Sequence, residues 1–181
     1  MRCRSAGALS ITSILSVALF ASPNLLGWSE GDASASVQFQ RDAMCTVTAV
    51  PDRPLTPPAP YPSRAPYANF WHGHEGLWTS LRADGTWARL PRNDRGFRQK
   101  IFWWHPGFDG RVEGQPDLKV TGRRLDGPES FVHPAPATNA HHVDFGGWTI
   151  LTGIDVPVPG CWELTGTYRG QSVSFVVWIT A

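Results

Sequence analysis

The sequence is poor in charge and has almost no lysine. Charged residues make up 17% of its 181 positions, and 16 basic against 15 acidic side chains leave a formal net charge of +1. Only Lys100 and Lys119 are lysines. Proteins that bind nucleic acid through bulk electrostatics carry a clear basic excess. The composition therefore argues against a nucleic acid partner.

Several motifs of enzymatic chemistry are also absent. The sequence has no G-x-S-x-G nucleophile elbow, no G-x-x-x-x-G-K-[ST] phosphate loop and no C-x-x-C pair. His74 and Glu75 begin like the H-E-x-x-H motif of zinc proteases, but Trp78 stands where the second ligand is needed. Gly76 is also unfavourable in the helix that this motif requires. The question of an enzyme stays open, with the balance against one.

Long apolar runs are scarce, and the clearest one lies at the N-terminus. Arg2 and Arg4 precede an apolar stretch over residues 6–21, which is shorter than the ~20 residues of a spanning helix. This pattern predicts a secretory signal peptide within residues 1–35, cleaved after Ala35 or alternatively after Ala21. An uncleaved signal segment is the alternative, and it would be the only contact with a membrane. We expect a secreted, periplasmic or cell-envelope protein.

Cysteine is rare, and its number fits that location. Removal of residues 1–35 takes away Cys3 and leaves Cys45 and Cys161, which are 161 − 45 = 116 positions apart. In an oxidising compartment such a pair predicts a disulfide, worth about 4–5 kcal/mol by the chain-entropy argument. Two free buried thiols are the alternative.

Proline gathers in one segment ahead of the main domain. Residues 51–66 contain seven prolines in sixteen positions and exclude a helix or a central strand. Together with a short alternating stretch at residues 45–50, they form an N-terminal strand and Pro-rich connector over residues 36–68. This connector is a linker or a strap lying on the protein surface, with an SH3-type ligand as a further alternative.

From residue 69 onward, short apolar runs alternate with turn residues, which predicts strands and no amphipathic helix. The Asp84-Gly85 turn predicts a hairpin between residues 77–81 and 86–90. Other strands are expected at residues 100–104, 117–121 and 148–152, and a closing hairpin is expected from strands that hold Trp162 and Leu164 and residues 173–179, joined by a turn at residues 168–171. We therefore expect an all-β, antiparallel two-layer sandwich over residues 69–181.

The segment PGCWELTGTYRGQSVSFVVWI, residues 159–179, resembles the last hairpin of an immunoglobulin-like sandwich. The longer run over residues 71–179 resembles a group of secreted bacterial proteins without an established activity. The pieces that carry this second resemblance are FWHGHEGLWTSL, GFRQKIFWWHPGFDG, LKVTGRRLDGP and GCWELTGTYRGQSVSFVVWI. The position of Cys161, before the aromatic residue, departs from antibody-type domains, so their inter-sheet disulfide is not implied.

Tryptophan is abundant, with nine residues. Neighbours along a strand face opposite sides, so Trp103 and Trp104 cannot both enter one core. Outward rings at Trp71, Trp104 and Trp178 are the candidate ligand-binding residues, because exposed aromatics can stack on sugar rings. The favoured alternative is that the Pro-rich segment covers the outward rings, since large exposed apolar patches are uncommon.

Two histidine pairs are candidate metal ligands. His72 and His74 are two positions apart and face the same side of a strand, while His141 and His142 form a second pair. Zinc or copper would bind if the two pairs met. No other cofactor is expected.

Charge is unevenly distributed along the chain. Residues 89–124 carry nine basic against four acidic groups, and residues 125–181 carry one against five. This segregation of charge could guide an anionic ligand to the basic segment, or the two segments could pair with each other. The favoured interpretation is that these charges belong to solvated surfaces without a specific partner.

The sequence is most consistent with a non-catalytic binding or accessory module, whose partner would be a cell-wall glycan or another envelope protein. One alternative is a small hydrolase of cell-wall or polysaccharide material that uses Glu75 or Asp144 near His72 and His74. The other alternative is a histidine-based metal-binding protein.

Overall fold

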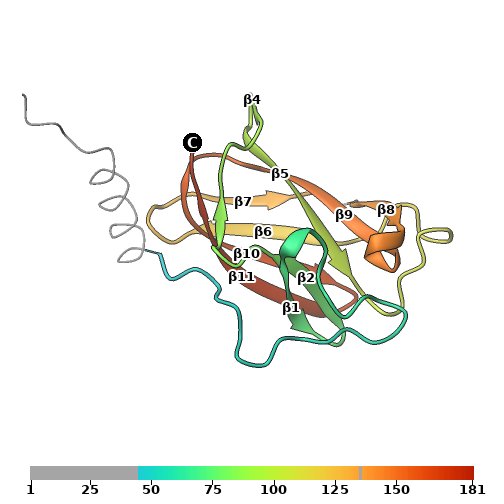
Figure 1. Ribbon diagram of the computed structural model, residues 1–181. Coiled ribbons are helices and arrows are strands. Elements are labelled where there is room, and N and C mark those ends of the chain that lie inside the picture. Colours follow the sequence, from blue (N-terminus) through green and yellow to red (C-terminus); the bar gives the residue numbers. More distant parts are fainter. Residues whose placement is uncertain (1–44, 135) are drawn as a thin grey trace, which may run out of the picture.

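The computed structural model describes residues 45–134 and 136–181 (Figure 1). The predicted signal peptide and Cys3 lie outside these residues. The described chain consists of strands, loops and two single-turn 3-10 segments. In chain order the elements are η1 (Pro66–Ala68), β1 (Phe70–His74), β2 (Leu77–Leu81), β3 (Thr86–Trp87), β4 (Arg92–Asn93), β5 (Gly96–Trp104), β6 (Lys119–Arg124), β7 (Ser130–His133), β8 (Thr138–His142), η2 (Val143–Phe145), β9 (Gly147–Val156), β10 (Gly160–Tyr168) and β11 (Gln171–Ile179).

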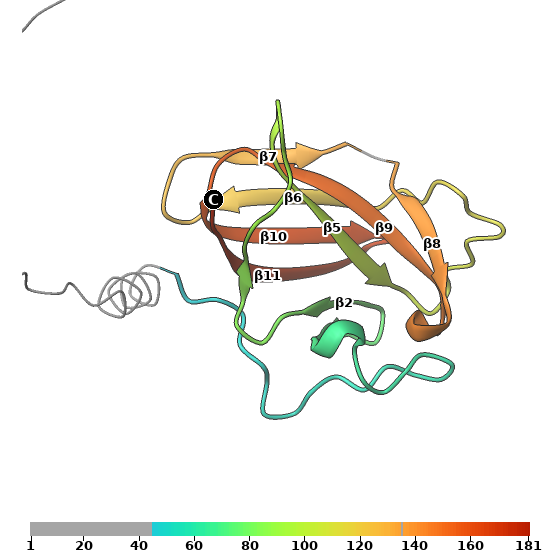
Figure 2. The same cartoon turned by 45° about the horizontal axis from the view of Figure 1, so that its top comes forward.

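The strands form two sheets that pack face to face (Figures 1 and 2). Sheet A has the order β1-β2-β5-β9-β8, with β4 also paired to β5, and sheet B has the order β3-β11-β10-β6-β7. The predicted all-β sandwich is therefore confirmed. One pair departs from the antiparallel expectation, because β3 runs parallel to β11 over two residues. Within the two described ranges, no helix has the length and hydropathy needed to cross a membrane.

The main core lies between the sheets and follows from the alternation of apolar residues along each strand. Trp103 and Ile101 of β5 point inward from sheet A, opposite Trp162 and Phe175 of sheet B. The Trp103 indole is fully buried and donates a hydrogen bond from Nε1 to Thr152 Oγ1 at 3.0 Å. The predicted closing hairpin is confirmed, with β10 and β11 paired along their whole length from Gly160↔Ile179 to Tyr168↔Gln171.

A second, smaller core lies on the outer face of sheet A. Its buried members are Trp71, Trp78, Trp104 and Phe145. The Pro-rich segment over residues 51–66 covers these rings, and Leu55, Tyr61 and Ala65 pack against them. Figure 1 shows this segment as an extended coil that passes below β1 and β2 and returns to η1. The predicted strap is thus confirmed for sheet A, and residues 51–66 are called the strap below.

The strap is held by specific contacts as well as by apolar packing. The Tyr61 ring meets the Trp78 ring edge-on, with centroids 5.1 Å apart, and the Tyr61 hydroxyl donates to the His105 carbonyl at 3.2 Å. Trp71 Nε1 donates to the carbonyl of Pro62 at 3.1 Å. Proline fixes φ and costs little additional entropy on ordering, so a proline-rich chain is well suited to lie along a surface in this way.

The predicted hairpin between residues 77–81 and 86–90 is wrong. Its turn does form, since the Gly85 N–H donates to the Arg82 carbonyl at 3.0 Å. However, β2 pairs with β1 and β5 in sheet A, whereas β3 pairs with β11 in sheet B. Leu81 enters the core from sheet A and Trp87 enters it from sheet B. The Asp-Gly turn therefore carries the chain across the core from one sheet to the other.

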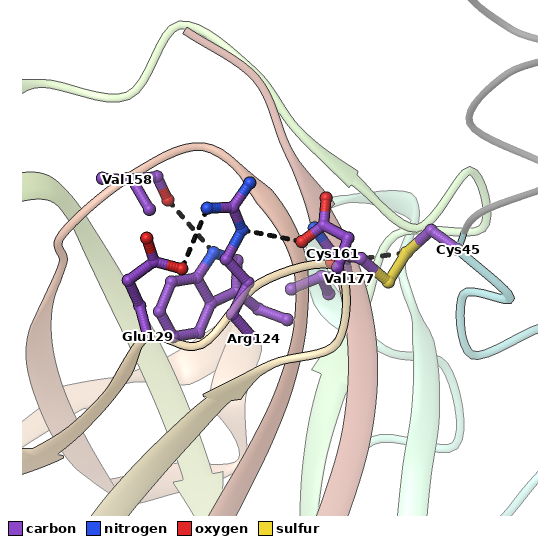
Figure 3. Close-up of polar contacts among 8 residues, drawn as sticks. Cys45, Arg124, Glu129, Val158, Cys161 and Val177 are labelled. Atoms are coloured by element: carbon purple, nitrogen blue, oxygen red, sulfur yellow. Dashed lines mark hydrogen bonds and ion pairs between the residues drawn. A yellow bond between two sulfur atoms is a disulfide. The ribbon is translucent and has the colours of Figure 1, made fainter.

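The described chain starts beside sheet B, where the predicted disulfide is present. Cys45 and Cys161 are bonded with their Cα atoms 5.5 Å apart (Figure 3). Residues 45–50 do not form the expected strand. Instead, the Thr48 N–H donates to the Val176 carbonyl and Thr48 Oγ1 accepts from the Val176 N–H, at 2.9 and 2.8 Å. This segment therefore pairs locally with the edge of β11.

Candidate functional site

Two of the three candidate tryptophans are not available for stacking on a ligand. Trp71 and Trp104 lie under the strap with 2% and 0% of their surface exposed. Trp178 is half-buried on the outer face of sheet B, directly opposite Cys161 in the β10–β11 ladder. It therefore lies on the other side of the sandwich from Trp71 and Trp104. The three residues do not form a common platform.

The two histidine pairs do not meet. His72 and His74 lie on β1, and His141 and His142 lie on β8, which are the strands at opposite ends of sheet A. Across residues 45–134 and 136–181, no group of three or more His, Cys, Asp or Glu side chains could hold a metal ion. The expected convergence into a zinc or copper site is therefore not found in the described chain.

His72 and His74 hold the two sheets together instead. His72 Nε2 lies 2.9 Å from the carbonyl oxygen of Ser174, and His74 Nε2 lies 3.3 Å from that of Ser172. These carbonyls belong to the outer edge of β11, so each imidazole must carry its proton on Nε2 to donate. In His74 the other ring nitrogen, Nδ1, accepts the Gly76 N–H at 3.1 Å, which fixes the same tautomer.

The acids of the hydrolase alternative are also dispersed. Glu75 is exposed in the turn after β1, whereas Asp144 lies in η2 beside His142, at the far edge of sheet A. His142 Nδ1 accepts the Asp144 N–H at 3.2 Å and so acts as the cap of η2. Asp144 is thus far from His72 and His74, and the proposed acid–imidazole constellation does not assemble.

The segregated charges pair with one another to a large extent. Asp155 contacts both Arg95 and Arg98, and Arg123 contacts Glu163 at 2.9 Å. Burial acts to raise the pKa of Asp155, but hydrogen bonds from Arg98 and Asn93 outweigh it and leave this pKa below its usual value. Part of the basic middle segment is therefore neutralised by acids that follow it in the chain.

A polar cluster near the β10–β11 turn has a structural role. The buried Tyr168 donates its hydroxyl proton to Glu113 Oε2 at 2.6 Å, and Arg169 Nη2 reaches the same oxygen at 2.7 Å. Burial and the Glu113 contact raise the pKa of Tyr168. Burial and the nearby Arg169 lower the pKa of His105. These contacts attach the loop over residues 105–118 to the turn.

The most distinctive opening lies where β2 and β5 separate. These neighbours in sheet A pair only at Trp78↔Trp104 and Thr79↔Trp103. Beyond Thr79 the two strands diverge, although β2 continues to Leu81 and β5 extends back to Gly96. The divergence leaves a cleft of about 230 Å³ in the outer surface of the sandwich. We call it the β2–β5 cleft.

The edge of β5 that faces the cleft is satisfied by groups outside the sheet ladder. The Arg98 N–H donates to the Pro91 carbonyl, and the Phe102 carbonyl accepts the Thr79 hydroxyl at 2.8 Å. Between them, the Lys100 N–H donates to the side-chain oxygen of Gln99 at 3.1 Å. Buried main-chain groups without partners are costly, so these three hydrogen bonds offset part of the cost of separating the strands.

The cleft combines apolar and polar surface. Its apolar side is formed by Trp87, Ile101 and Phe102, and the aromatic ring of Tyr67 stands at its rim. The remaining lining residues offer amide, hydroxyl and cationic groups, and they are Asn69, Ser80, Arg82, Gln99 and Lys100. Pockets with a few polar groups placed among apolar walls are typical of small-ligand sites. A second hollow of about 290 Å³ shares Tyr67, Asn69 and Arg82 with it and extends it along the surface.

Tyr67 is presented by an unusual backbone. Tyr67 and Ala68 both have positive φ, at 59° and 56°, in the single turn of η1. Non-glycine residues rarely adopt this region, and such residues concentrate at functional sites. The Tyr67 side chain is 74% exposed, yet its ring makes an edge contact with Phe145 at 6.1 Å between centroids. The end of the strap thus holds an aromatic ring in solvent beside the cleft.

The cleft carries positive charge. No carboxylate or imidazole is among its nine lining residues. Arg82 is engaged by Asp84 through two hydrogen bonds, at 3.1 and 2.9 Å. Lys100, by contrast, makes no ion pair with any of the described residues. Gly153, its partner on β9, has no side chain and leaves the surface beside Lys100 open.

The β2–β5 cleft could not be recognised in the sequence. Its residues come from η1, β2, β3, β5 and the loop positions that flank β1 and β2, and they form no motif along the chain. Tyr67 carries no signal of a positive φ, since it is neither glycine nor asparagine. The single available signal is the polar Gln99, which takes an inward-facing position of β5 between the buried Phe97 and Ile101.

Comparisons of the chain with models of protein families, with curated proteins and with solved structures found no match.

Proposed function

We propose that this protein is a non-catalytic binding module that works outside the cytoplasm and binds a glycan at the β2–β5 cleft. The observation that carries the proposal is the exposed Tyr67 ring at the rim of a cleft lined by amides and a hydroxyl. Sugar rings present apolar C–H faces and many hydroxyls, so they suit one aromatic ring beside several hydrogen-bond partners.

The lining residues favour binding over hydrolysis. Glycoside hydrolysis ordinarily uses a pair of carboxylates across the scissile bond, and the cleft lining has none. Among the residues that line the cleft and the adjoining hollow, Asp84 is the single acid, and its carboxylate is already hydrogen-bonded to Arg82. A binding role also agrees with the size of the cleft, about 230 Å³, which is below the range of pockets that bury a whole small ligand.

The location forms part of the same proposal. A disulfide persists most readily in an oxidising compartment, and Cys45 and Cys161 are bonded. The apolar stretch at residues 6–21 supplies an export signal that agrees with this location. The immunoglobulin-like character of the sandwich is likewise a proposal, supported by the two packed sheets and the closing β10–β11 hairpin.

The test is binding of soluble glycans measured by calorimetry and by intrinsic fluorescence. The probes are glycan strands released from peptidoglycan, chitotetraose and tetragalacturonate. We expect at least one probe to bind with millimolar to micromolar affinity. Tyr67→Ala should weaken that binding about threefold to tenfold, which is the contribution of one aromatic contact.

Two variants serve as controls for this test. Tyr67→Phe keeps the ring and should retain most of the affinity. Val143→Ala changes another exposed apolar residue, 81% exposed in η2, and should have no effect. The proposal is overturned if no probe binds, or if binding is equal in the protein with Tyr67 and in Tyr67→Ala.

A further inference from the structure

Resting on the proposed function, we infer that the β2–β5 cleft selects acidic saccharides, with Lys100 binding a carboxylate carried by the sugar while Tyr67 contacts the ring. Both residues line the same cleft, and Lys100 lies on its β5 wall. The inference names the chemical class of the ligand, which the aromatic ring alone does not determine.

Positive charge in the cleft is not balanced by its own lining residues. Its two cations, Arg82 and Lys100, face no carboxylate among the lining residues. Asp84, in the adjoining hollow, neutralises Arg82. This leaves one positive charge on Lys100, and a single ring carboxylate balances it.

Asp155, which lies on the same face of sheet A as Lys100, does not compete for it. This acid lies opposite Arg98 in the β5–β9 ladder. Arg95 and Arg98 both contact that carboxylate, at 3.2 and 2.9 Å. Asp155 is therefore already engaged, and the lysine ammonium stays available to an incoming anion.

Lys100 is accessible to a ligand. Lys100 is exposed on the outer face of sheet A, beyond the area covered by the strap. Its neighbour across the ladder is Gly153, around which no atom lies within 4 Å of an added Cβ. An exposed cation at the edge of a concave, partly apolar surface attracts an anion more strongly than one on a flat surface, because the low-dielectric walls focus its field.

The experiment compares tetragalacturonate with its methyl ester, in which methylation removes the negative charge of each carboxylate and leaves the sugar chain unchanged. Calorimetry at low and at 0.5 M salt should show tetragalacturonate binding about fivefold more tightly at low salt, and this preference should shrink at high salt. Lys100→Gln should make the two affinities equal. Lys119→Gln, the matched control, removes the only other lysine, which lies on sheet B beside Asp117, and should keep the preference.

The outcomes separate this inference from the proposed function. If chitotetraose binds in a Tyr67-dependent manner but tetragalacturonate binds no better than its ester, the acidic preference is wrong and the glycan-binding function stands. The role of Lys100 is also wrong if Lys100→Gln keeps the preference. If none of the three probes binds, the proposed function itself fails.

Discussion

His72 and His74 show how a correct pattern can lead to the wrong partner. Their spacing of two predicts that both imidazoles face the same side of a strand, and both do reach β11. The acceptors there, Ser174 and Ser172, are also two positions apart. Nothing in the sequence places β1 beside β11, so the carbonyl partners could not be predicted. The two rings close one side of the sandwich by capping main-chain groups of β11 in the part of that strand that β3 does not cover.

At the scale of these residues, we predict that His72→Ala combined with His74→Ala lowers the free energy of unfolding by about 1–3 kcal/mol. Each substitution removes one hydrogen bond and leaves a carbonyl of β11 to be solvated, which costs about 0.5–1.5 kcal/mol per bond. Urea denaturation followed by tryptophan fluorescence measures this change. His141→Ala, on the opposite edge strand, should have a smaller effect.

The effect of zinc on the melting temperature tests whether the same two histidines bind metal. We expect excess zinc to leave the melting temperature of the chelator-treated protein unchanged. A zinc-dependent rise in the protein with both histidines, lost in the double variant, would show that these residues bind metal after all.

At the scale of elements, alternation and composition predicted some features and missed others. The opposite orientation of Trp103 and Trp104 followed from strand geometry. The Pro-rich composition of residues 51–66 predicted that this segment covers the outward ring, Trp104. The Asp84-Gly85 turn was also recognisable, but its two flanking strands joined different sheets. A turn motif specifies a local reversal and not the pairing partners, which depend on long-range packing. The β2–β5 cleft was unpredictable for the same reason, because it arises where paired strands stop pairing.

The strap leads to a prediction at this scale. Tyr61→Ala should lower the free energy of unfolding by about 2–4 kcal/mol, because it removes the edge contact with Trp78, the hydrogen bond to the His105 carbonyl and apolar burial. The tryptophan emission of the folded variant should shift to longer wavelength as the indoles gain solvent. Tyr61→Phe is the matched control and should lose only about 1 kcal/mol, with little spectral change. Equal stability of all three proteins would mean that the strap does not contribute to the second core.

At the scale of the whole molecule, the protein has two cores that share sheet A. The larger core lies between the sheets, and the smaller one lies between sheet A and the strap. The disulfide belongs to neither core, because Cys161 faces away from the main core on the outer side of sheet B. A network of polar contacts nevertheless starts at the main chain of Cys161. The Cys161 N–H donates to Asp126 at 3.1 Å, and Arg124 joins Asp126 to Glu129 (Figure 3).

We predict that replacing both Cys45 and Cys161 by alanine lowers the free energy of unfolding by about 4–5 kcal/mol, since the bond closes a loop of 116 positions. Chemical denaturation with and without a reducing agent measures this loss. Reduction should bring the unmodified protein to the stability of the variant and leave the variant unchanged. Alkylation of both thiols in the native, unreduced protein would contradict the bridge.

The position of this disulfide also determines how mechanical load travels through the fold. A pull on the chain ahead of Cys45 reaches the covalent bond before it reaches the strap. The bond transmits the force to β10, which is hydrogen-bonded to β6 on one side and to β11 on the other. Residues 51–66 and the Tyr67 turn lie downstream and are bypassed. A protein tethered on its N-terminal side would therefore keep its β2–β5 cleft relaxed while tension passes through the opposite sheet.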